Sequence, residues 1–178
     1  MTEEPVGGES RAAAPQGGLA WEGFVAGLIG YATIVVLYAV GNLVGGEWIL
    51  HTPTVLGSAI LGDAVPDPVS AAGPAPIFVY NGLHLLAFLG VGFGSAWLVR
   101  EIEMHPVEWY LAFFAFVMAF MFSLVVVYAV AVPVLEAFPT GSVLWANLAA
   151  AGAVGFYLAR RHRGLLERVS REGDPEAE

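Results

Sequence analysis

The sequence predicts an all-α membrane protein with four transmembrane helices and a short interfacial or re-entrant segment between helices one and two. Of its 178 residues, 57% are apolar and only 13% are charged, whereas a soluble domain usually carries about 25% charged residues. Most charges lie near the two ends of the chain. The apolar runs between them are continuous and close to the roughly 20 residues that a helix needs to cross a bilayer, about twice the length of a barrel strand.

Three regions follow from this distribution. Residues 1–18 are rich in Gly, Pro, Ala and Glu and are expected to form a disordered tail. Residues 19–163 contain all the long apolar runs and should form the transmembrane domain. Residues 164–178 should form a C-terminal tail on the same side of the membrane as the first.

The four predicted spans differ in length. The third exceeds the bilayer thickness and should tilt or protrude, while the fourth is near the lower limit for a span. The predicted spans cover about residues 21–44, 76–99, 107–135 and 142–158.

The connection between the first two spans is unusual. Residues 51–63 are too apolar for a plain loop and too short to cross the membrane, so an interfacial or re-entrant helix is expected. Thr52 could cap this helix, and Pro53 suits its first position. The following run, 64–76, contains four prolines and should be extended and irregular.

Arginine predicts the orientation, because the chain contains no lysine. With four spans, every arginine falls on one side, and the two loops on the other side have none. The positive-inside rule then places both termini in the cytoplasm and the chain in the cytoplasmic (inner) membrane. The arginines nearest the fourth span, Arg160, Arg161 and Arg163, are expected to anchor this span to anionic lipid. The arginines are Arg11, Arg100, Arg160, Arg161, Arg163, Arg168 and Arg171.

Small residues at four-residue spacing predict where helices approach closely, because lipid provides no hydrophobic drive for helix association. We expect these positions to pack the helices of one chain together; the alternative is a contact between chains. The three pairs are Gly23 and Gly27, Gly90 and Gly94, and Ala151 and Gly155.

Polar side chains gather at one predicted level, beneath the outer surface. The functional interpretation is a polar pocket centred on His84, which could ligate a metal or haem, relay a proton or bind a quinone. The alternative is that these groups only form hydrogen bonds between helices, each worth about 0.6 kcal/mol. No metal-ligand spacing is present, so the sequence identifies no metal site and no cofactor. The polar residues are Asn42, His51, Asn81, His84, Tyr128, Glu136 and Asn147.

The run HTPTVLGSAILG at residues 51–62, followed by residues 81–89 with His84, carries a resemblance. It is similar to a group of uncharacterised bacterial four-span membrane proteins with an HTPxxLGSA-type outer segment. The resemblance implies the topology and no activity. It directs attention to His51, Pro53, Gly57 and His84 without giving any of them a role.

These observations order the candidate functions. A non-catalytic accessory or structural subunit of a larger membrane complex comes first, because the chain is small and has no catalytic motif. We therefore expect that the protein is not an enzyme. A small homo-oligomeric transporter or channel comes second, and a haem, quinone or metal-binding protein using His84 comes third. The expected partners are the lipid bilayer and other membrane subunits. Nucleic acid is not among the expected partners. The net charge of −9 is not itself evidence on this point, because it comes largely from the tails.

Overall fold

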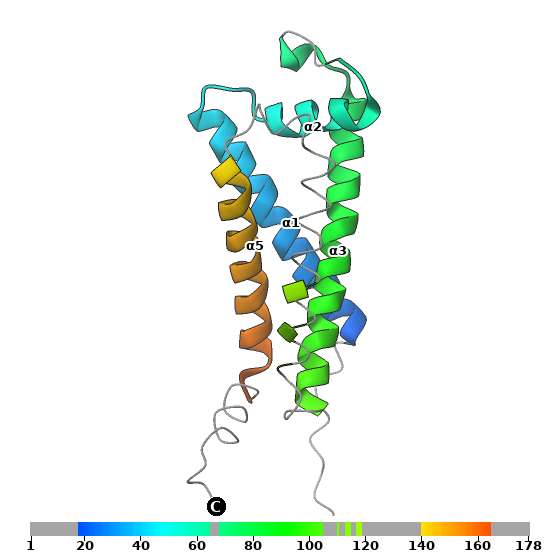
Figure 1. Ribbon diagram of the computed structural model, residues 1–178, viewed down its shortest axis with the longest axis vertical. Helices are drawn as coiled ribbons and strands as arrows, with labels where there is room; N and C mark the ends of the chain where they lie inside the picture. The colour runs from blue at the N-terminus through cyan, green and yellow to red at the C-terminus, as the bar shows by residue number, and fades with distance from the viewer. Residues whose placement is uncertain are drawn as a thin grey trace, which may run out of the picture.

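In the computed structural model of the protein, the described residues form helices and no strands (Figure 1). The structure describes residues 18–64, 68–104, 110, 113–114, 117–118 and 140–164. Three long helices run along the molecule, and a short helix lies across one end of them. The elements are α1 (Leu19–Val44), α2 (His51–Leu61), the 3₁₀ turn η1 (Val69–Ala71), α3 (Pro74–Met104) and α5 (Thr140–Arg161).

The three long helices are apolar and long enough to cross a membrane, as predicted. They contain 26, 31 and 22 residues, about 39, 46 and 33 Å at 1.5 Å per residue, against about 30 Å of hydrocarbon. Each extends beyond its predicted apolar run, and α3 continues five residues past the predicted end at 99. The predicted third span, 107–135, lies largely outside the described residues, so four-span topology stays a prediction.

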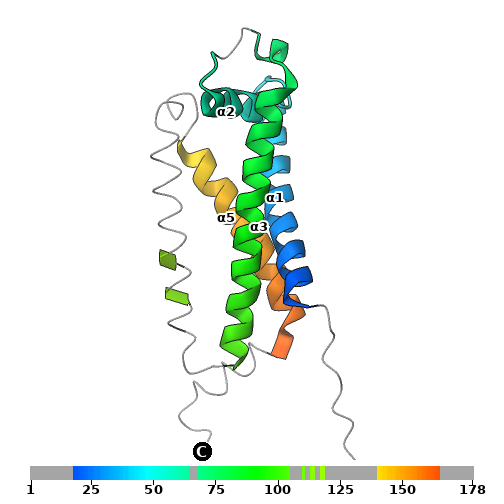
Figure 2. The same cartoon turned by 90° about the vertical axis from the view of Figure 1, so that its right-hand side faces the viewer.

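Helix α1 is packed against both other long helices (Figures 1 and 2). Against α5, its contact is made by small and aliphatic side chains that form a stripe at four-residue spacing. The buried residues of this contact are Ala26 and Ile34 from α1 and Ala146, Ala150, Val154 and Leu158 from α5.

Against α3, helix α1 makes backbone-to-backbone contact through glycine. A Cβ atom added at Gly92 would collide with the Gly23 carbonyl oxygen and the Gly27 amide nitrogen, and would lie 2.6 Å from Gly27 Cα. On the α1 side, a Cβ at Gly27 would lie 2.8 Å from Leu89 Cα, and one at Gly23 2.8 Å from Phe93 Cα. Only glycine allows two helix backbones to approach this closely.

The glycine pair predicted for α3 is not the one found in this contact. A Cβ added at Gly90 or Gly94 meets no heavy atom of the described residues within 4 Å, and the same holds at Gly155. Ala151 is exposed. The role of Gly90, Gly94, Ala151 and Gly155 in packing therefore stays a prediction.

The short helix α2 lies across the ends of the long helices and packs mainly on the first turn of α3. Gly57 makes this possible, because a Cβ there would collide with the Pro76 backbone. Its 11 residues span about 16 Å, roughly half the hydrocarbon thickness. A short helix within residues 51–63 was predicted; whether it is interfacial or re-entrant stays a prediction. We call this end of the molecule the α2 end. The opposite end, where α3 ends at Met104 and α5 ends at Arg161 directly before His162, is the His162 end.

The predicted start of α2 was wrong in detail. The helix begins at His51 with Leu50 as the preceding residue, and no side chain caps it. The Thr52 hydroxyl, which was expected to cap α2, instead donates a hydrogen bond to Asn42 Oδ1 of α1. Pro53 is consequently the third helical residue, where its missing N–H still costs no helical hydrogen bond.

Glycine ends both helices of this region with the same motif. Gly46 and Gly62 have φ angles of +77° and +75°, in the left-handed region that favours glycine. In each case the next residue bonds back five positions, Glu47 N–H to Asn42 and Asp63 N–H to Ser58, which is a Schellman motif. After Asp63, the run expected to be irregular contains η1, and α3 begins at Pro74 rather than at residue 76.

Candidate functional site

The polar residues of α1 and α2 meet in a network that fastens α2 to the end of α1. Thr52 Oγ1 donates to Asn42 Oδ1 over 2.8 Å, and Asn42 Nδ2 donates to the Ile49 carbonyl over 3.1 Å. Thr52 is only 1% exposed, so its hydroxyl needs this acceptor. Asn42 belongs to the predicted polar cluster, and its hydrogen bond to Thr52 joins α1 to α2, in line with the alternative that these groups bond between helices.

A second group lies between α1 and α3. The Tyr31 hydroxyl of α1 donates to Asn81 Oδ1 of α3 over 3.0 Å, and Asn81 Nδ2 donates to the Ile77 carbonyl one turn earlier. This pair joins two helices by one hydrogen bond between side chains. Asn81 and His84 share one face of α3, as their three-residue spacing predicted.

His84 is surrounded by aromatic rings. Its ring stacks on Tyr80 with centroids 5.1 Å apart, and lies 5.0 Å from Phe88 and 6.3 Å from Tyr31 of α1. His84 Nε2 is buried and has no hydrogen-bond partner among the described residues. A buried nitrogen without a partner costs about 1–3 kcal/mol, so a ligand that bonds to this atom would relieve that cost.

The other described members of the predicted cluster make their polar contacts with groups other than His84. His51 Nδ1 lies 3.1 Å from Glu47 Oε2, close enough for an ion pair but without hydrogen-bond geometry. Asn147 Nδ2 donates to the Val143 carbonyl of its own helix. Tyr128 and Glu136 lie outside the described residues. Within the described part of the chain, no hydrogen bond links these groups into one pocket.

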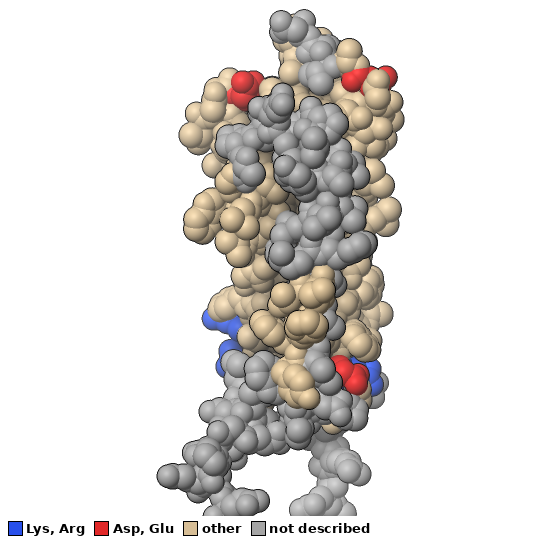
Figure 3. All heavy atoms as spheres, in the orientation of Figure 1, with Lys and Arg blue, Asp and Glu red and all other residues tan. Residues whose placement is uncertain are grey.

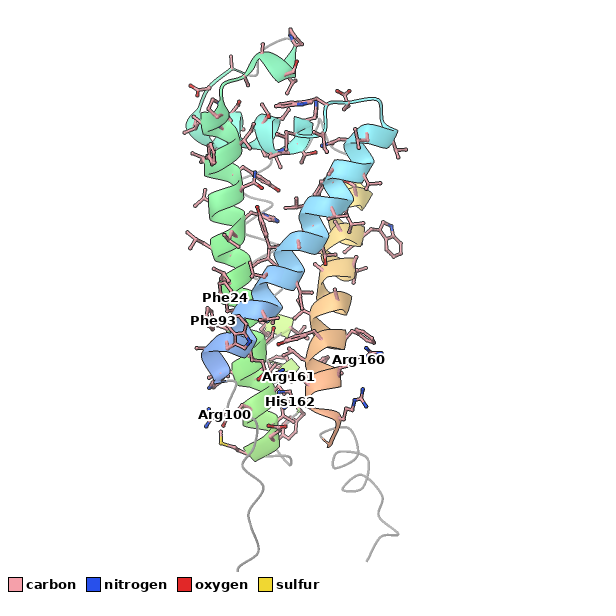
Figure 4. The ribbon with its side chains drawn as sticks, turned by 180° about the vertical axis from the view of Figure 1, so that it is seen from behind. Phe24, Phe93, Arg100, Arg160, Arg161 and His162 are labelled. Carbon is pink, nitrogen blue, oxygen red and sulfur yellow. The ribbon has the colours of Figure 1, made fainter. Side chains whose placement is uncertain are left out.

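Among the described residues, a closely bonded group of polar side chains lies at the His162 end. The sequence predicted only lipid-anchoring arginines there. His162 follows directly after α5 (Figure 4). Its ring lies between carboxylates from both other long helices. Nε2 is 2.7 Å from Glu22 Oε1 in the first turn of α1, and Nδ1 is 2.6 Å from Glu103 Oε1 in the last turn of α3. Arg161 Nε lies 3.9 Å from the same Glu22 oxygen.

Burial and helix ends explain why these charges gather. Glu22 is only 7% exposed, and a buried carboxylate requires charged or hydrogen-bonding partners. The positive N-terminus of α1 favours Glu22, and the negative C-terminus of α5 favours a protonated His162, whereas Glu103 lies at the unfavourable end of α3. A positive partner therefore also offsets the unfavourable position of Glu103.

The two carboxylates also change the pKa of His162. Burial by itself lowers that pKa, but the hydrogen bonds and negative charges of Glu103 and Glu22 outweigh it, so the pKa is raised above its ordinary value of 6.5. A histidine with two acidic partners thus carries its charge at higher pH than a free one.

A signal for this set was present in the sequence. Glu22, Glu103 and His162 are titratable residues at or just beyond the inner ends of predicted spans one, two and four. The depth comparison used for the outer polar residues would have grouped them. The neighbouring Arg160 does point away, with its guanidinium 4.6 Å from the centre of the Phe156 ring. Arg160 and Arg163 are exposed, so their anchoring role stays a prediction.

The described residues contain no group of three or more His, Cys, Asp or Glu side chains that could hold a metal ion. Comparisons with family models, curated proteins and solved structures gave no match. Among the described residues, three helices are long and apolar enough to cross a membrane. The resemblance carried by residues 51–62 and 81–89 stays a prediction.

Proposed function

We propose that this chain is a non-catalytic accessory or structural subunit of a larger complex in the cytoplasmic membrane. The observation that carries the proposal is how the chain uses its polar side chains. Tyr31 bonds to Asn81, Thr52 to Asn42, and His162 to two carboxylates, all within the same chain. Polar groups that bond internally hold helices in place and leave the outer faces apolar.

Those outer faces fit lipid chains or the helices of another subunit. All three long helices expose large apolar side chains. Helix α1 packs on α3 by direct backbone contact at Gly92, and on α5 through the stripe of small and aliphatic residues. Among the most exposed side chains are Val36 on α1 (58%), Phe78 on α3 (75%) and Trp145 on α5 (71%). An apolar surface of this kind supports a role in assembly.

The mass and composition of the particle extracted from native membranes in mild detergent test the proposal. We expect the chain to arrive with other subunits in a fixed ratio. Because the chain has no cysteine, a photo-crosslinker can be attached at a single introduced cysteine. Val36→Cys, Phe78→Cys and Trp145→Cys each probe one helix face, and Ala26→Cys, at a fully buried position, is the control that should label poorly. Recovery only as a monomer or homo-oligomer would contradict the accessory role and favour the transporter alternative.

The arrangement of arginine supports the proposed orientation. On the face in Figure 3, the Lys and Arg atoms, which are arginine in this chain, gather at the His162 end. The connection from Gly45 to Gly73 has no arginine, and this pattern would place the His162 end in the cytoplasm. Gly46→Cys and Gly164→Cys test it. A membrane-impermeant maleimide applied to spheroplasts should label the first and not the second, and the reverse pattern would invert the topology.

His84 supports a second candidate, a binding site for a quinone, a haem or a metal ion. Its buried Nε2 lacks a partner among the described residues, and three aromatic rings surround it. Protein purified from native membranes should then carry a chromophore, a lipid-extractable quinone or a metal that His84→Gln loses and His51→Gln keeps. Protein that lacks all three would remove this candidate.

A further inference from the structure

The contacts of His162 fix how many protons it shares with its partners. A neutral imidazole has one N–H and one lone pair, yet both ring nitrogens lie within 2.7 Å of a carboxylate oxygen. A lone pair facing an ionised carboxylate at this distance is repulsive. Both contacts are satisfied when both nitrogens carry hydrogen, or when the carboxyl group facing the lone pair is protonated. Either arrangement holds one proton more than a neutral histidine between two carboxylates.

The charge of the set leads to the same proton. With His162 protonated, two carboxylates, one imidazolium and the nearby Arg161 sum to zero. Without that proton, a net negative charge remains around Glu22, whose side chain is 9% exposed. The groups facing His162 are Glu22 from α1, Glu103 from α3 and Arg161 from α5. The other charged residues of these helix ends are Arg100, Glu101, Arg160 and Arg163.

We propose that Glu22, His162 and Glu103 form a proton-binding site that joins the ends of α1, α3 and α5, and that loss of the proton releases the end of α5 from α3. Helix α5 makes few contacts with α3 elsewhere, so the bond between His162 and Glu103 is a main link between them. Helix α1 stays on α3 through Gly92. The ligand is a proton, and the proposed topology would expose the site to cytoplasmic pH. Nothing in the accessory role requires this property.

The direction of the pH effect follows from linkage. The pKa of His162 in the folded chain lies above its ordinary value of 6.5. The stabilisation is therefore fully present below about pH 6.5 and is lost as the pH rises through the folded-state pKa. Between these two values, the equilibrium constant for unfolding should increase about tenfold per pH unit.

Histidine NMR of the full chain in nanodiscs of zwitterionic lipid tests proton binding. The chain has four histidines, and the His162 signal is identified by its absence in His162→Gln. We expect its titration midpoint above 6.5, a lower midpoint in Glu103→Gln, and no change in His51→Gln, which removes a His–Glu pair at the α2 end. A midpoint at or below 6.5, or one that Glu103→Gln does not lower, would overturn the proposal. If His162→Gln does not fold, the His162 signal is the one that persists in each of His51→Gln, His84→Gln and His105→Gln.

Spin labels test the release of α5. The exposed positions Met104 and Gly164 are changed to cysteine in the cysteine-free chain, and pulsed electron spin resonance measures the distance between the labels. We expect the distance distribution to lengthen and broaden as the pH rises through the NMR midpoint, and to be independent of pH in His162→Gln. An unchanged wild-type distribution across that midpoint refutes the release step, whatever the NMR titration shows.

Discussion

Replacing Gly92 by alanine is the most direct test of how α1 and α3 are packed. The added methyl group would collide with backbone atoms of Gly23 and Gly27 and would lie 2.6 Å from Gly27 Cα, where ordinary contact begins at about 3.4 Å. Backbone atoms cannot rotate away as a side chain can. The two helices must therefore separate by most of an ångström along their contact.

The expected cost follows from this displacement. Overpacking a close contact costs about 1–3 kcal/mol, which corresponds to roughly 5- to 150-fold in the equilibrium constant for unfolding. Gly90→Ala and Gly94→Ala, each two residues from Gly92, are matched controls because no described atom lies within 4 Å of an added Cβ. They should be neutral, or stabilising by up to about 1 kcal/mol, since alanine favours helix over glycine.

Reversible unfolding in mixed micelles with increasing denaturing detergent measures all three variants on one scale. The sequence pattern alone predicts that Gly90→Ala and Gly94→Ala are the damaging changes, whereas the structure predicts Gly92→Ala. A Gly92→Ala variant as stable as the controls would refute the close backbone contact. Two damaged controls would show that Gly90 and Gly94 meet a partner outside the described residues.

Three further changes probe the ties between elements. Tyr31→Phe removes one interhelical hydrogen bond and should cost about 0.6 kcal/mol in the same unfolding assay; a loss above 2 kcal/mol would show that the hydroxyl has a larger role. Asn42→Ala leaves the buried Thr52 hydroxyl without its acceptor, costs about 1–3 kcal/mol and should speed hydrogen exchange throughout α2; unchanged exchange there would contradict the tie. Gly57→Ala places a methyl group against the α3 backbone and should expose the α2 region to protease, whereas Gly82→Ala, with open space around it, should not.

The candidate site was predictable only in part. The shared helix face of Asn81 and His84 followed from spacing, because an α-helix fixes which residues share a face. The partners did not follow: Tyr31 bonds to Asn81 and Thr52 bonds to Asn42, and both bonds depend on how separate helices are rotated about their axes. The His162 site was missed for a similar reason, since its three groups are separated by as many as 140 residues.

Composition and periodicity by themselves determined that this chain is helical, that three described segments suit a membrane and that a short helix separates the first two. These properties belong to single segments, because each backbone must satisfy its own hydrogen bonds in lipid. Only the tertiary structure decided that Gly92 rather than Gly90 or Gly94 meets α1, and that His162 lies between two carboxylates. Those outcomes depend on the relative rotation and offset of helices, which the pattern along one helix does not specify.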